Sequence, residues 1–157
     1  MSDNFILAFA FGIGVVAGLR SLTAPAAVSW GAYLGWLNLQ GSPLAFMGSI
    51  VMVAISSLLA IGELGADLSP SIPKRTAPGP LAGRLLMGGL CGACLCASAG
   101  QSLPIGALLG ALGGLIGAFA GYELRRRLVA GWNIRDAVVA VIEDLIAIGL
   151  ACFFVAR

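Results

Sequence analysis

The stretch from Pro104 to Gly121 reads PIGALLGALGGLIGAFAG and decides the fold. Its glycines recur at about every fourth residue, at positions Gly106, Gly110, Gly114, Gly117 and Gly121. On an α-helix this spacing gathers the glycines into one ridge that carries no side chains. In water such a helix is poor, because each glycine costs about 1 kcal/mol relative to alanine. In lipid the backbone must satisfy its own hydrogen bonds, and a bare ridge lets a neighbouring helix pack closely. The stretch therefore predicts the central helix of a membrane bundle.

The composition of the whole chain supports the same class. Of its 157 residues, 59% are hydrophobic and only 10% are charged, and the mean hydropathy is +1.00. Soluble domains carry about a quarter charged residues. A net charge of +2 is small for a nucleic-acid partner, and the absence of histidine removes the commonest general base and metal ligand. We expect an all-α integral membrane protein with one domain, 1–157, no cofactor, no metal site, no nucleic-acid partner and no enzymatic activity.

Six apolar segments follow one another along the chain. The expected helices cover about Phe5–Leu22, Ala26–Leu39, Leu44–Leu64, Arg84–Gly100, Pro104–Gly121 and Asp136–Val155. The spacing of Gly31 and Gly35 predicts a second small-residue packing stripe. Four prolines between residues 65 and 83 predict a loop, and the arginines within 122–132 indicate a membrane surface. The four cysteines lie in apolar runs, where they are expected to fill tight helix contacts rather than to bind metal.

The distribution of charge predicts how the chain crosses the membrane. With six spans, every lysine and arginine except Arg157 falls on or near one side. Basic residues favour the cytoplasmic side, so both termini should face the periplasm and the 65–83 loop the cytoplasm.

The chain also contains an apparent internal repeat. Residues 55–62 match residues 142–149 at five of eight positions, and the RSLTAP segment that begins at Arg20 is similar to QSLP at Gln101. Because a unit of three spans crosses the membrane an odd number of times, its second copy starts from the opposite side and is inverted. The pattern therefore predicts a three-plus-three inverted repeat, about 5–64 and 84–157, with a pseudo-two-fold axis in the membrane plane.

Four phrases of the sequence, at 18–37, 73–84, 91–126 and 141–151, resemble a bacterial membrane-protein family catalogued as domain of unknown function 4126. The resemblance covers nearly the whole chain. It implies a protein of the bacterial inner membrane, and it brings no catalytic residues to carry over.

Three ionisable residues are expected at matching depths inside the membrane. Arg20 lies near the cytoplasmic end of the first helix, and Glu143 and Asp144 lie about 10–12 Å into the last helix from the same side. The simplest arrangement pairs Arg20 with one of the two carboxylates and leaves the other over. Such a pair would be either a structural salt bridge or part of a polar functional site. In a third arrangement, Arg20 would extend its side chain to the lipid headgroups. Glu63 and Asp67 are expected to lie at the surface.

Two functional hypotheses follow from these residues. The first is a transporter or channel-like protein for a small, anionic solute, because helix starts at Pro25 and Pro104 present free N–H groups. Its substrate-binding residues would be Arg20, Ser21, Gln101, Ser102, Glu143 and Asp144. The alternative is a membrane scaffold or assembly protein whose glycines serve packing alone. A water-accessible cavity beside Arg20 would favour the transporter. Expected partners are the lipid bilayer, a small solute and, if a glycine ridge is exposed, a second copy in a homodimer.

Overall fold

The computed structural model describes residues 3–66, 77–132 and 135–156, and its described part is entirely helical. The elements are α1 (Asp3–Leu19), α2 (Thr23–Tyr33), the 3-10 helix η1 (Ala45–Gly48), α3 (Ile50–Ala66), α4 (Pro78–Ser98), α5 (Leu103–Trp132) and α6 (Asp136–Val155). The predicted all-α class is confirmed.

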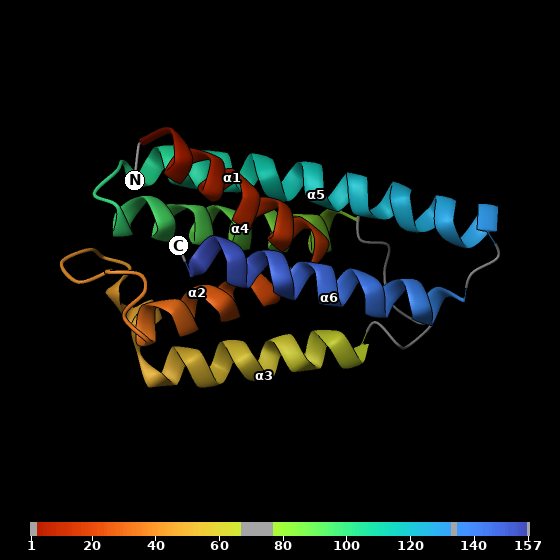
Figure 1. Cartoon of the computed structure of the whole chain (residues 1–157), viewed down its shortest axis with the longest axis horizontal. Coiled ribbons are helices and arrows are strands. Elements are labelled where there is room, and N and C mark those ends of the chain that lie inside the picture. Colours follow the sequence, from red (N-terminus) through yellow and green to blue (C-terminus); the bar gives the residue numbers. More distant parts are fainter. Residues whose placement is uncertain (1–2, 67–76, 133–134, 157) are drawn as a thin grey trace.

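Successive α-helices run in alternating directions, so the two termini lie at the same end of the bundle (Figure 1). We call this the terminal end. We call the opposite end the charged end, because a cluster of charged side chains lies there. At this end α1, α3 and α5 finish and α2, α4 and α6 begin (Figure 1).

The helices differ in whether they can cross a membrane. Three segments, 78–98, 103–131 and 137–155, are long and apolar enough to do so. The helices α1 and α3 have 17 residues each, and α2 has only 11. At 1.5 Å per residue α2 is about 16 Å long, roughly half of a ~30 Å hydrocarbon core. The predicted six helices are therefore present, and three of them have the dimensions of full spans.

The predicted extension of the second helix to Leu39 is wrong, because α2 ends at Tyr33. The carbonyl oxygen of Gly31 accepts hydrogen bonds from the backbone N–H groups of Trp36 at 2.8 Å and Leu37 at 3.1 Å, which closes the helix end. Gly35 adopts a φ of +80° and has nothing within 4 Å of the place where a Cβ would lie. It is therefore a turn glycine and not a packing residue, whereas a Cβ on Gly31 would overlap Val155 of α6.

The helix of the glycine ridge is longer than predicted. It continues without a break through the segment expected to mark the membrane surface, and ends at Trp132 after 30 residues. The predicted pair of Glu123 and Arg127 is present, with Oε1 2.8 Å from Nε, and Arg126 contacts the same carboxylate at 3.0 Å. These side chains are exposed, so the pair contributes only a few tenths of a kcal/mol.

The glycines of α5 lie against two helices at once. A Cβ on Gly106 would lie 2.5 Å from the carbonyl oxygen of Gly92 in α4, and one on Gly110 would fall within 3.0 Å of Gly88 in the same helix. On the other side, a Cβ on Gly117 would fall within 3.0 Å of Val15 in α1. The backbones of α1, α4 and α5 are therefore in direct contact, in the manner of small-residue packing in membranes.

The same ridge reaches further along α5 and is matched by glycines of its neighbours. A Cβ on Gly114 would lie 2.9 Å from the carbonyl oxygen of Arg84, and Gly121 is buried in the same helix. From α1, Cβ atoms on Gly14 and Gly18 would fall within 3.0 Å of the α5 backbone. Buried Cys91, Cys94 and Cys96 of α4 fill space beside this contact and are free thiols.

The two predicted repeats are packed differently. In the second half, α5 runs along both α4 and α1. Its counterpart in the first half, α2, packs mainly on α3, α6 and η1 (Figure 1). The inverted repeat therefore stays a prediction from the sequence.

Candidate functional site

The site begins at the break between α1 and α2. The first of these helices ends at Leu19 and the second begins at Thr23, with a turn over residues 20–22. Two helix ends meet here, and each leaves backbone groups without partners inside its own helix. At membrane depth such groups need partners from the protein, because lipid supplies none.

Glu63 of α3 supplies the partners for the start of α2. Its carboxylate accepts hydrogen bonds from the backbone N–H groups of Ser21 at 3.0 Å and Leu22 at 2.9 Å, and from the Ser21 hydroxyl at 2.6 Å. A negative charge at a helix N-terminus is favoured by the helix dipole. The expectation that Glu63 is a surface residue is therefore wrong.

Arg84 of α4 serves the end of α1. Its side chain is buried, at 7% exposed, and Nη1 donates to the carbonyl oxygens of Gly18 and Leu19, the latter at 2.8 Å. A positive charge is favoured at a helix C-terminus, where carbonyl groups point outward. Opposite charges from α3 and α4 thus satisfy the two helix ends. The sequence reasoning missed this role of Arg84.

Arg20, in the turn itself, connects the break to α6. Its side chain is 1% exposed and forms an ion pair with Asp144, while Nη1 lies 3.4 Å from the backbone oxygen of Glu63. One of the two predicted pairings is confirmed. Arg20 is buried among protein atoms, so it does not snorkel to the headgroups.

Glu143, the neighbouring carboxylate on α6, lies beside α5. Its Oε2 is 3.8 Å from Nη1 of Arg125, and the two side chains are 11% and 17% exposed. The prediction that one carboxylate is left over is therefore wrong. Arg125 belongs to this site, although the sequence placed it on the membrane surface.

The charged cluster is defined by three arginines and three carboxylates, which are Arg20, Glu63, Arg84, Arg125, Glu143 and Asp144. Its formal charge is zero, and it joins the α1–α2 break to α3, α4, α5 and α6. Ionisable groups inside a membrane cost about 2.5–3.5 kcal/mol each on insertion scales, so mutual pairing is the expected arrangement. Asp67 lies outside the described residues.

The structure separates two of the predicted binding residues from this cluster. Gln101 and Ser102 follow α4, at the terminal end, whereas Ser21 and its partners lie at the charged end (Figure 1). The end of α4 is satisfied by its own backbone, because Gln101 N–H donates to the Cys96 carbonyl oxygen at 2.8 Å and Gly100 adopts a φ of +68°. The six predicted substrate-binding residues therefore do not form one site.

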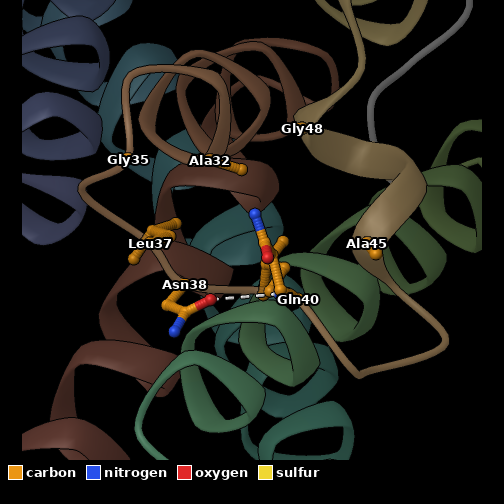
Figure 2. Close-up of a pocket in the computed structure, with 8 residues that line it drawn as sticks. Ala32, Gly35, Leu37, Asn38, Gln40, Ala45 and Gly48 are labelled. Atoms are coloured by element: carbon orange, nitrogen blue, oxygen red, sulfur yellow. Dashed lines mark hydrogen bonds between the residues drawn. The ribbon is translucent and has the colours of Figure 1, made fainter.

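A pocket lies at the terminal end, between the end of α2 and η1 (Figure 2). Its volume is about 470 Å³, and its lining contains no charged side chain; it is formed by Ala32, Gly35, Leu37, Asn38, Leu39, Gln40, Ala45 and Gly48. The Asn38 side-chain oxygen accepts a hydrogen bond from Gln40 N–H at 3.2 Å, and the Gln40 amide extends toward Ala32 (Figure 2). None of the predicted binding residues lines this pocket.

The fold and the charged cluster together define a helical protein of membrane type. Three of its helices have spanning dimensions, and six of its ionisable side chains, of which Arg20 and Arg84 are buried, form the charged cluster at one end. Among the described residues no group of three potential metal-binding side chains lies together. Comparison with family models, with curated proteins and with solved structures gives no match for this chain.

Proposed function

We propose that this protein is a small inner-membrane transporter or channel-like protein of bacteria, and that the charged cluster forms its gate at the cytoplasmic end. The observation that supports the proposal is the position of the cluster, which ties together two helix ends inside the bundle. Buried ionisable groups at membrane depth commonly line ion and solute pathways. Broken helices are the usual binding elements of small transporters built from repeats.

We propose a small anion as the solute. The charged cluster contains three guanidinium groups, and the N–H groups of Ser21 and Leu22 already hold a carboxylate, that of Glu63. The chemistry of the break therefore suits a carboxylate or a similar anion, which helix N-termini bind readily.

The proposal includes a topology with both termini in the periplasm. We expect a thiol reagent that does not cross membranes to label Ser102→Cys from outside intact cells. Ala130→Cys, at the far end of α5, should be labelled only after the membrane is opened. Both positions are exposed, and Cys152→Ser would remove the exposed native thiol. Labelling of Ala130→Cys in intact cells would contradict this orientation.

Transport can be tested in proteoliposomes with chloride, acetate and inorganic phosphate as probes. We expect the protein to release at least one of these anions faster than protein-free vesicles do. Asp144→Asn should change the rate, because it alters the ion pair with Arg20. Glu123→Gln, which changes an exposed carboxylate of α5, is the matched control and should leave the rate unchanged. Release equal to that of empty vesicles for all three anions would contradict the proposal.

The second candidate is a membrane scaffold, and one observation favours it. The backbones of α1, α4 and α5 are in contact along the glycine ridge, which leaves no room for a pathway between these three helices. A scaffold with this core would show no flux with any probe, and its cluster substitutions would change stability alone.

A further inference from the structure

We propose that α3 is the moving element of the bundle and that the Glu63 carboxylate is the latch that holds it closed. The inference goes beyond the proposed function, because it names the helix that moves and can be tested without a transport assay. It rests on the packing of α3, on the positions of its hydrogen bonds to the bundle, and on the backbone geometry of the residue before it.

The first argument is the weak packing of α3. Only Val53 and Ser56 of its 17 residues are buried. Its main neighbours are α2 and η1, whereas α1, α4 and α5 form the glycine-packed core. Large apolar side chains such as Leu58, 71% exposed, face away from the protein. An element with few buried contacts opens at a lower free energy than the core does.

The second argument is where the polar ties lie. Near the middle of α3, Ser57 accepts a hydrogen bond from the Trp30 indole at 3.0 Å. At the charged end, the Glu63 carboxylate receives the hydrogen bonds from Ser21 and Leu22 described above. Hydrogen bonds to an ionised group are stronger than neutral ones, so the contact of Glu63 is the stronger tie.

The third argument is the connection at the other end of α3. Ser49 is extended, with φ −78° and ψ 147°, and separates η1 from α3. Ala45 and Gly48 of η1 line the 470 Å³ pocket. An extended residue beside open space allows α3 to tilt about its first turn, because hinges are a few element-terminal residues that absorb the change in backbone angles.

A tilt of this kind would act directly on the charged cluster. The Nη1 atom of Arg20 contacts the backbone oxygen of Glu63, and the Arg20 side chain is only 1% exposed. Moving the end of α3 away would uncover Arg20 and free the N–H groups at the start of α2. The latch therefore controls access to the break.

The test measures two distances between spin labels in lipid nanodiscs, in a Cys152→Ser background. One pair, Gly65→Cys with Leu86→Cys, reports on the charged end; the other, Val51→Cys with Leu108→Cys, reports on the terminal end. The four labelled positions are exposed. In Glu63→Ala we expect the first distance to broaden and lengthen by about 4 Å, which is a tilt of about 10° for a helix of this length. The second distance should stay the same.

Two further variants make the result decisive. Glu123→Gln removes an exposed carboxylate of α5 and should change neither distance. Ser21→Ala removes only the hydroxyl bond to Glu63, and should broaden the first distance less than Glu63→Ala does. This milder variant decides the question if Glu63→Ala does not fold. An unchanged first distance in the folded variants would overturn the latch, and it would leave the proposed transport function standing.

Discussion

Replacing Gly110 with alanine is expected to unfold the bundle or to lower its free energy of unfolding by about 4 kcal/mol or more. A Cβ at this position would fall within 3.0 Å of the Gly88 carbonyl group and 3.1 Å from the Gly92 Cα, both in α4. These neighbours are backbone atoms, which cannot make room by changing rotamer as a side chain can. The helices would have to separate along their whole contact, and packing along α5 would be lost on both sides. Leucine at Gly110, Gly114 or Gly117 should have the same effect or a larger one.

The matched control is the same substitution at Gly62 of α3. No atom lies within 4 Å of the place where its Cβ would be, and the residue is inside a helix, four residues from its end. Gly62→Ala should therefore raise stability, by up to about 1 kcal/mol, through helix propensity. Thermal unfolding in detergent measures both changes. If Gly110→Ala melted at the wild-type temperature, the backbone contact between α4 and α5 would be refuted.

Replacing Arg20 with leucine is expected to cost about 3–5 kcal/mol, because it breaks a buried pair and leaves a charge behind. The side chain of Arg20 is 1% exposed, and that of its partner Asp144 is 17% exposed. Leucine cannot replace the contact with the Glu63 carbonyl oxygen either. The loss should appear as a lower melting temperature in detergent.

A second substitution separates the charge effect from lost packing. Asp144→Asn, added to Arg20→Leu, removes the carboxylate that has lost its partner. The double variant should recover part of the lost stability, with a coupling free energy of about 0.5–3 kcal/mol between the two positions. Strict additivity of the two changes would mean that the Arg20–Asp144 pair contributes nothing to the fold.

The helices could be predicted from the sequence because lipid leaves the backbone few alternatives to a helix. The boundaries depended on details that spacing does not contain. Gly35 continues the spacing of Gly31, yet its φ of +80° places it in the turn after α2. Conversely, the arginines after Gly121 indicate a membrane surface but do not stop a helix, since arginine is a good helix former. The helix α5 therefore continues to Trp132.

The depth of a residue along its helix predicts part of the charged cluster, and the same calculation applied to every helix would have indicated more of it. Equal depth from the predicted cytoplasmic side indicates that Arg20 pairs with Glu143 or Asp144, and the structure has the pair with Asp144. Glu63 is the fourteenth residue of α3 and Arg84 the seventh of α4, which places both near that level too. The sequence places Glu63 at the surface beside a predicted loop over residues 65–83 and gives Arg84 no role, whereas α4 already begins at Pro78. Which side chain caps which helix end depends on tertiary packing, and local sequence does not specify it.

The unequal lengths of the helices have a consequence for the surrounding lipid. On one side the bundle presents α5, about 45 Å long, and on the other α2 and α3, about 16 Å and 26 Å long (Figure 1). Hydrocarbon chains beside the short helices must shorten or tilt to match them, at a cost of a fraction of a kcal/mol for each ångström of mismatch. The bilayer is therefore expected to be pinched beside α2 and α3, and the protein to favour thin membranes. A charge that crosses the membrane would therefore travel the shortest distance through hydrocarbon beside α2 and α3.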